Sequence, residues 1–198
     1  MTSTRDIPML RFRETLERAA RLAPPPPADH SAVTLATADA AGRPSARVVL
    51  VRAFDDEGIV FYTNYASRKA REIALNPHAA LCFYWHWLEE QVRVEGAVVR
   101  ASREESDAYF SSRPRDSQLG AWASQQSQPL PTRDELEQRL ESVRSEFEGR
   151  NVPRPEFWGG FRLIPDRFEF WKAGHARLHE RTRYALVPDG WVVDHLYP

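Results

Sequence analysis

The chain has 198 residues, of which 27 are basic and 28 acidic, and its formal net charge at pH 7 is -1. That length allows one domain with a substantial hydrophobic core, and we predict a single domain over residues 1–198. The near-neutral charge argues against a global field for nucleic acid or an anionic membrane, so any anion site must be local.

Cys82 is the only cysteine, which excludes an intrachain disulfide and a thiolate zinc cage. It lies in an apolar run, so we expect it to be a small core residue. No apolar signal core or membrane-spanning stretch is evident, and we expect a cytoplasmic protein without a membrane partner.

The first part of the chain reads as a helix followed by a meander of strands. Apolar residues at helical spacing predict an N-terminal helix within residues 1–23, which the prolines at 24–27 end. Alternating β-branched and apolar residues between turn signals then predict three strands, at 31–39, 45–54 and 59–64. A short helix is expected at 67–77, with Ser67 as its N-cap and Asn76-Pro77 as its stop.

The second part continues with strands and gains two helices. Strands are predicted at 78–87 and 90–102, helices at 103–112 and 132–149, and further strands at 159–174, 177–187 and 191–198. Six or more strands with few helices favour a mainly β (α+β) fold, a closed or nearly closed antiparallel barrel with helical additions.

Several arginines occur where an anion would be useful, although each could also be solvated surface. Arg68 and Lys69 open a short helix, where cations are unfavourable unless an anion compensates them. Arg47 and Arg52 are an odd number of residues apart on one strand, so they should face opposite sides unless a bulge intervenes. The polar run 111–127 carries two more arginines beside a tryptophan.

Two strands show period-two sets of polar side chains. Gln91, Arg93 and Glu95 share one face of their strand, which is usual for a half-solvated sheet. On a strand, Arg177, His179 and Arg181 would all point the same way and suit an anionic planar ligand. The sequence has no convincing metal spacing, phosphate loop or nucleophile elbow, so no metal is expected.

Taken together, these motifs resemble the pyridoxamine 5'-phosphate oxidase family from about Ala32 to Pro198. The motifs are RVVLVR, FYTNYASRKA, WHWLEEQVRVEG, YFSSRPRDSQLGAWASQQS, FWGGFR, EFW and RLHER. The resemblance implies a split β-barrel homodimer with FMN at the subunit interface. It also implies oxidation of pyridoxamine and pyridoxine 5'-phosphate to pyridoxal 5'-phosphate, with O2 as acceptor and H2O2 released.

The same resemblance assigns site residues, several of them acting from the partner subunit. FMN would contact Arg47, Val48, Val49, Leu50, Tyr62, Thr63, Arg68, Lys69, Gln91, Gln126, Ser127, Trp171 and Arg181. The phosphorylated pyridine substrate would contact Arg52, Tyr109, Arg113, Ser117, Arg177 and His179. Of these, Arg177 and His179 would be the catalytic pair, in a positioning and polarising role.

Departures from the family pattern leave alternatives open. Arg52 replaces the family's lysine, His175 and Ala176 precede Arg177, and the chain begins near the point where family members carry a substrate-covering segment. A related FMN oxidase acting on a phenazine precursor and a non-catalytic binder of FMN or pyridoxal phosphate are the alternatives. A barrel that binds single-stranded nucleic acid is disfavoured by the neutral charge.

Overall fold

The structure is a computed structural model that describes residues 7–26 and 28–198. Its eight strands are β1 Ala32–Ala38, β2 Pro44–Asp55, β3 Gly58–Asn64, β4 His78–Trp85, β5 Glu90–Arg100, β6 Trp158–Lys172, β7 Glu180–Val187 and β8 Gly190–His195. Its helices are α1 Ile7–Leu22, α2 Arg68–Leu75, α3 Arg103–Ser112, α4 Arg115–Ala123 and α5 Arg133–Glu146, with a short 3-10 turn, η1, at His175–Arg177.

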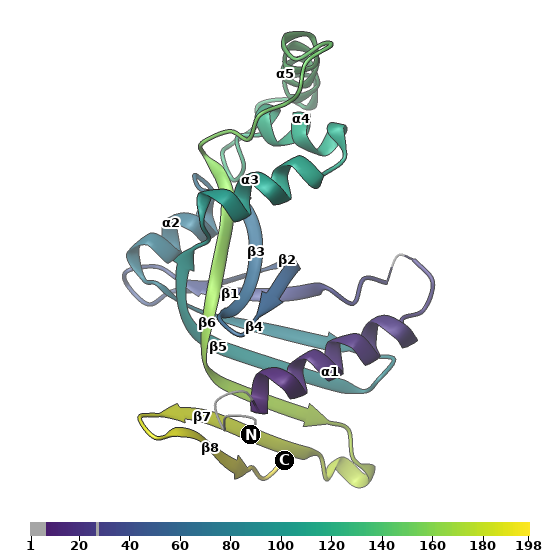
Figure 1. The fold of residues 1–198 in the computed structure, drawn as a ribbon, viewed down its shortest axis with the longest axis vertical. Helices are drawn as coiled ribbons and strands as arrows, with labels where there is room; N and C mark the ends of the chain where they lie inside the picture. The colour runs from purple at the N-terminus through teal and green to yellow at the C-terminus, as the bar shows by residue number, and fades with distance from the viewer. Residues whose placement is uncertain (1–6, 27) are drawn as a thin grey trace.

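The strands form one antiparallel sheet in the order β3-β2-β1-β4-β5-β6-β7-β8. An additional pairing of β3 with β6 closes the first six strands into a barrel, and β7 and β8 extend the sheet beyond it (Figure 1). The predicted antiparallel barrel is therefore confirmed. The side chains of β5 alternate as predicted, since Val92 and Val94 are buried while Gln91, Arg93 and Glu95 face outward.

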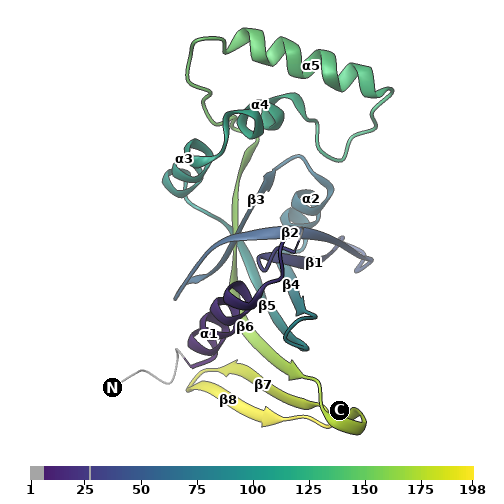
Figure 2. The ribbon, with the colours of Figure 1, turned by 90° about the vertical axis from the view of Figure 1, so that its right-hand side faces the viewer.

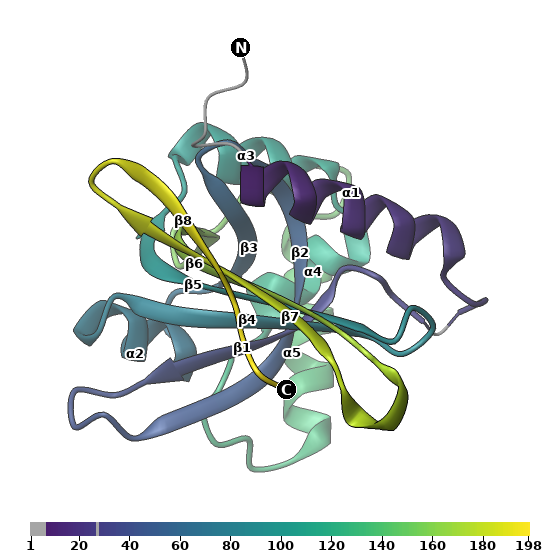
Figure 3. The ribbon, with the colours of Figure 1, turned by 90° about the horizontal axis from the view of Figure 1, so that it is seen from below.

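Helix α1 packs over the core of the barrel with its apolar stripe. Phe12 is completely buried, and its ring centroid lies 5.2 Å from that of Phe83 and 5.7 Å from that of Phe54. Seen from below, α1 lies beside the crossing β7–β8 hairpin (Figure 3). The predicted helix over 1–23 is thus described from Ile7 to Leu22, and its first six residues, like Pro27, lie outside the described residues.

An excursion of three helices, α3 to α5, separates β5 from β6 and stands at one end of the long axis, opposite β7 and β8 (Figures 1 and 2). Helix α3 begins at a capping box in which Ser102 and Glu105 satisfy each other's backbone N–H groups. The helix predicted within 132–149 is α5. Phe147, the C-cap residue of α5, is buried in a second, smaller core with Phe110, Leu119 and Trp158.

Three local expectations differ from the structure. Helix α4 was not expected, because its segment lacks a clear apolar period, yet Leu119 and Ala123 are buried. Cys82 is not a core residue: it is half-buried on the outer face of β4, opposite Arg93. Strand β7 begins at Glu180 instead of Arg177. No helix in the described part of the chain has the length and apolarity needed to cross a membrane.

Candidate active site

A cavity of about 540 Å³ opens between β2, β3, α2, the α3–α4 segment and the start of β6. Twelve of the side chains that the family resemblance assigned line it together: Arg47, Val48, Val49, Leu50, Arg52, Tyr62, Thr63, Lys69, Tyr109, Arg113, Ser117 and Gln126. Segments far apart in the sequence therefore converge on one site, and four of the converging groups are cationic.

Lys69 forms one cationic wall of the cavity. Its ammonium donates to Thr63 Oγ1 at 3.1 Å and to Gln126 Oε1 at 3.0 Å, and Thr63 also donates to Gln126 at 2.8 Å. Burial, and secondarily the charge of Arg47, lower the pKa of Lys69 to about 8. Neutral oxygens do not compensate a buried charge, so this wall is suited to an anion.

Arg47 reaches the same wall from β2. Its Nη1 donates to Thr37 Oγ1 at 2.5 Å and to the Leu35 carbonyl at 3.2 Å. Arg68 does not line the cavity; its Nε donates to Glu72 Oε1 at 2.8 Å, and its side chain is largely exposed. Ser67 occupies the N-cap position of α2 with extended backbone, but its side chain makes no capping hydrogen bond.

Arg47 and Arg52 both line the cavity, as do Val48, Val49 and Leu50 between them. The cavity therefore borders both faces of β2, and the expected opposition of the two arginines stays a prediction. The register of β2 against β3 shifts between Val51 and Ala53, which places an irregularity at Arg52 itself. A bulge inserts one residue and reverses the alternation of the side chains that follow, so it acts beyond Arg52 and leaves the alternation from Arg47 to Val51 regular.

Arg113 forms a second cationic wall, held by aromatic rings. The rings of Tyr62 and Tyr109 stack at 4.0 Å, and Tyr62 also stacks on Trp158 at 5.6 Å. The Arg113 guanidinium lies 4.7 Å from the Trp158 ring centroid, and its buried Nη1 has no hydrogen-bond partner among the described residues. Desolvation lowers the pKa of Arg113, with a smaller contribution from Arg52. An anion in the cavity would supply the missing partner.

Trp158 is the functional candidate that sequence reasoning missed. The motif FWGGFR belongs to the family resemblance, but its tryptophan received no role. Trp158 nevertheless lines the cavity, and the Arg113 guanidinium lies over its ring. The signal was the glycine pair that follows it. A Cβ at Gly160 would approach Tyr62 Cε1 to 3.0 Å, so glycine lets the Tyr62 ring lie flat beside the strand. Arg115, by contrast, is structural, because it donates to the carbonyls of Phe147 and Arg150.

The remaining assigned residues do not line this cavity. Gln91, Trp171 and Arg181 form one row across β5, β6 and β7, since Trp171 is in register with both neighbours. Arg181 donates to Glu169 Oε1 at 2.9 Å. Ser127 lies in the α4–α5 loop with φ of 70°, next to Gln126 but outside the cavity wall.

Arg177 and His179 lie in the β6–β7 turn, so the expectation that Arg177, His179 and Arg181 share a strand face is wrong. Arg177 ends η1, and both it and Ala176 have left-handed backbone, with φ of 62° and 53°. The chain reverses too tightly there for a strand, because a Cβ at Gly174 would lie 1.9 Å from the Leu178 carbonyl oxygen.

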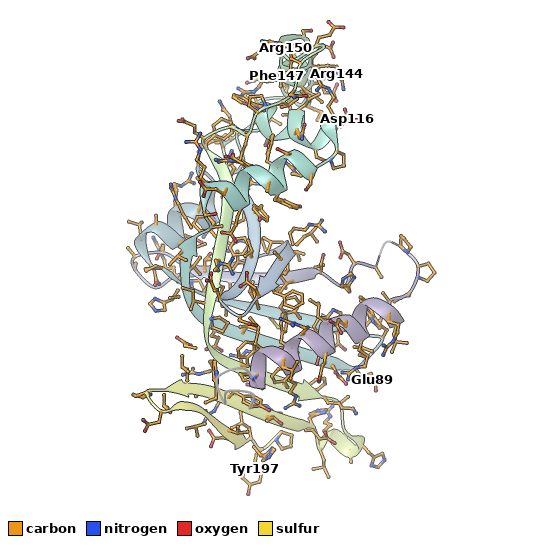
Figure 4. All side chains as sticks on the ribbon, viewed as in Figure 1. Glu89, Asp116, Arg144, Phe147, Arg150 and Tyr197 are labelled. Carbon is orange, nitrogen blue, oxygen red and sulfur yellow. The ribbon has the colours of Figure 1, made fainter. Side chains whose placement is uncertain are left out.

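The His179 ring is held in this turn, whereas Arg177 is exposed. His179 Nδ1 accepts a hydrogen bond from the Gly174 N–H at 3.2 Å, and its ring centroid lies 4.7 Å from that of Trp171. The turn is tied to the β4–β5 turn, since the Ala173 N–H donates to the Glu89 carbonyl. Figure 4 shows Tyr197 at one end of the molecule and Arg150 at the other, with Glu89 in the half that holds Tyr197.

The donor set suits an organic anion better than a metal. Within residues 7–26 and 28–198, no group of three or more histidine, cysteine, aspartate or glutamate side chains is placed to hold a metal ion. The cavity instead offers two cationic walls, Arg47 with Lys69 and Arg52 with Arg113, and aromatic rings between them. Such an arrangement binds phosphates and a planar ring.

Comparison with known proteins agrees with this geometry. Residues 25–147 match a family model described as Pyridoxamine 5'-phosphate oxidase, and residues 158–198 match one described as Pyridoxine 5'-phosphate oxidase C-terminal dimerisation region. A pyridoxine/pyridoxamine 5'-phosphate oxidase of Anaeromyxobacter dehalogenans is 55% identical over 96% of this chain and 95% of its own length. That of Rubrobacter xylanophilus is 60% identical over 81% of this chain and 74% of its own length.

Solved structures share the fold. PhzG from Burkholderia lata, in complex with tetrahydrophenazine-1-carboxylic acid, aligns with a TM-score of 0.87 at 31% identity and covers all of this chain and 94% of its own. A pyridoxamine 5'-phosphate oxidase-related, FMN binding protein from Nostoc punctiforme aligns with a TM-score of 0.74 at 19% identity, over 95% of each chain. The match to the dimerisation region also indicates a homodimer.

Proposed function

Because the chain belongs to the pyridoxamine 5'-phosphate oxidase family, we propose that it oxidises pyridoxamine and pyridoxine 5'-phosphate to pyridoxal 5'-phosphate. FMN is the cofactor, O2 is the electron acceptor and H2O2 is released. The curated relatives of that name at 50–60% identity support this activity over most of the chain.

The observation that carries the proposal is the unpartnered, buried Nη1 of Arg113 in a cavity that already has a separate cationic wall at Lys69. Two phosphates, one on FMN and one on the substrate, require two such groups. Arg47, Arg68 and Lys69 would hold the FMN phosphate. Arg52 and Arg113 would hold the substrate phosphate, with hydroxyl groups from Tyr109 and Ser117.

The flavin ring would lie along β2 and β3, where Val48, Val49 and Leu50 line one side and Tyr62 and Thr63 another. The partner subunit would supply Gln91, Trp171, Arg177, His179 and Arg181, since none of the five lines the cavity of its own chain. This arrangement would put FMN at the subunit interface and would explain why Arg177 is exposed in a single chain.

When bound, FMN would supply the redox chemistry, as acceptor of a hydride from the substrate carbon that bears the amine or alcohol, with O2 taking the two electrons and leaving as H2O2. For the amine substrate, water would hydrolyse the resulting imine to the aldehyde and release ammonia. The protein contributes alignment and charge. The hydrogen bond from the Gly174 N–H makes His179 Nδ1 an acceptor, so a neutral His179 presents its Nε2 proton to the substrate. Arg177 adds a positive charge beside the ring, and the two phosphate clamps hold the reacting carbon in place.

An aerobic assay of the FMN-loaded dimer tests this function. Pyridoxamine 5'-phosphate, pyridoxine 5'-phosphate, unphosphorylated pyridoxamine and tetrahydrophenazine-1-carboxylic acid are compared by H2O2 release and product absorbance. We expect turnover of the two phosphorylated pyridines and far slower turnover of unphosphorylated pyridoxamine. Turnover of the phenazine compound alone would assign the chain to the alternative oxidase, and no turnover of any compound would favour a binding protein.

A further inference from the structure

Glu72 is a buried carboxylate beneath the cationic wall formed by Arg47 and Lys69. Glu72 belongs to α2, only 5% of its surface is exposed, and it does not line the cavity. Thr37 Oγ1 donates to its Oε2 at 2.5 Å, and Ser45 Oγ donates to the same oxygen at 2.6 Å. These hydroxyl groups belong to β1 and β2, so the carboxylate fastens α2 to the barrel.

The same carboxylate contacts both arginines proposed for the FMN phosphate. Arg68 Nε donates to Oε1 at 2.8 Å, and Arg47 Nη2 approaches Oε2 at 3.4 Å. Arg47 is also fixed through the hydroxyl groups that anchor Glu72, because it donates to Thr37 and to Ser45. One buried side chain therefore sets the direction of two guanidinium groups that come from different elements.

We propose that Glu72 is a positioning residue that orients Arg47 and Arg68 for the phosphate of the flavin and so selects the phosphorylated cofactor. The inference rests on the proposed function, because it takes FMN as the ligand of this wall. Glu72 itself would not touch the cofactor.

Glu72 has two opposing effects on the affinity for the FMN phosphate, and the net change in that affinity is what the experiment measures. A negative charge near a phosphate weakens its binding by Coulomb repulsion, so a carboxylate that served only as a counter-ion would make FMN bind more weakly. A carboxylate that fixes two bidentate donors removes the cost of ordering them when phosphate binds. The geometry favours positioning, because the carboxylate accepts hydrogen bonds from both elements that carry the arginines.

The carboxylate is charged throughout the usual pH range, so it is no pH switch. Burial alone would raise the pKa of Glu72, but hydrogen bonds from Ser45, Thr37 and Arg68 outweigh it and hold the pKa at about 2. A buried pair that loses one partner leaves the other charge uncompensated, and for this reason Glu72→Gln is preferred to truncation.

The experiment measures dissociation constants for FMN and for riboflavin, which lacks the phosphate, on flavin-free dimer of the wild type and of Glu72→Gln. We expect FMN to bind about 10- to 100-fold more weakly to the variant, the range for hydrogen bonds to charged groups. Riboflavin affinity should stay within about twofold, and so should kcat at saturating FMN, because neither depends on phosphate orientation.

The matched control is Glu137→Gln. Glu137 also pairs with an arginine four residues away on a helix, Arg133, but lies exposed on α5. Its substitution should change neither affinity. If Glu72→Gln does not fold, Ser45→Ala and Thr37→Val remove the anchors of the carboxylate one at a time, and each should weaken FMN but not riboflavin.

Three outcomes would overturn the inference: unchanged FMN affinity, tighter FMN binding, or an equal loss for FMN and riboflavin. Tighter binding would make Glu72 a counter-ion only, and an equal loss would make it merely structural. A wild-type protein that binds no FMN would instead refute the proposed function, so the two failures are distinguishable.

Discussion

The cavity wall and the β6–β7 turn carry the two halves of the proposed site, and they differ in burial and in backbone conformation. In the cavity, Lys69 is buried and its hydrogen bonds are made within one chain. In the turn, Arg177 is exposed and follows another left-handed residue, Ala176. Under the proposed function, the groups that would hold phosphate are therefore preorganised in each subunit, whereas the groups that would face the substrate ring would take their working place only against a partner.

Arg177→Ala gives the largest expected effect, because it tests the half that depends on the partner. We expect kcat to fall about 10²- to 10³-fold, the usual loss for one preorganised charged or donor group. FMN affinity should change little, since Arg177 does not line the phosphate wall. Steady-state kinetics and flavin fluorescence check both, with exposed Lys172→Ala as control. Equal losses of turnover and of FMN affinity would contradict the assigned role.

Arg113→Ala tests the preorganised half. Removing the guanidinium should raise KM for pyridoxamine 5'-phosphate about 10- to 100-fold, because one charge-assisted contact to phosphate is lost. We expect a smaller effect on kcat, because Arg113 would hold the substrate phosphate and would not contact the reacting carbon. Arg103→Ala, an exposed arginine of α3 with one ion pair, is the matched control. A KM equal to that of the wild type would point to another substrate.

Lys69 makes FMN binding pH-dependent. Its pKa is lowered from 10.5 to about 8 by burial and by Arg47, and a bound phosphate would raise it again. FMN affinity should therefore fall, by up to about tenfold per pH unit, as the pH rises above 8. Titrations from pH 7 to 9.5 measure this, and Lys69→Arg should abolish the dependence.

The stability of the flavin-free protein should move in the opposite direction. Between pH 8 and 10.5 the unfolded state binds more protons at Lys69 than the folded state does, so the free energy of unfolding should rise across that window. Denaturant titrations at several pH values check the sign, and Lys69→Met should flatten this part of the profile. A fall in stability through the window, specific to the wild type, would contradict the burial of a charged Lys69.

Ala176→Asn should produce the smallest effect, a gain of about 1 kcal/mol in the free energy of unfolding. Left-handed backbone costs an alanine about 1–2 kcal/mol, and asparagine tolerates it better. Denaturant titration measures the change, and Ala40→Asn, at an exposed position without positive φ, is the control. No gain over the control would mean that the turn is not strained at Ala176.

The strands of the barrel could be predicted because buried and exposed residues alternate between turn signals, as around Val92 and Val94. Most side chains of the cavity could be named only through family motifs, since the lining residues span 111 positions, from Arg47 to Trp158. Two features had no local signal. The irregularity at Arg52 depends on the pairing of β2 with β3. The left-handed backbone at Ala176 falls on an alanine, whereas glycine or asparagine at that position would have predicted a turn.

The place where the chain leaves and re-enters the barrel has an evolutionary consequence. Arg100, the last residue of β5, lies opposite Phe161 of β6, so the three helices between them begin and end at neighbouring points of a hairpin. Tyr109, Arg113 and Ser117 belong to that insert, whereas Arg47 and Lys69 belong to the barrel and to α2. Exchange of the part of the insert that carries Tyr109, Arg113 and Ser117 would therefore change the proposed substrate contacts while leaving Arg47 and Lys69 in place. Gln126, which accepts from Lys69, belongs to the same insert and would have to be kept.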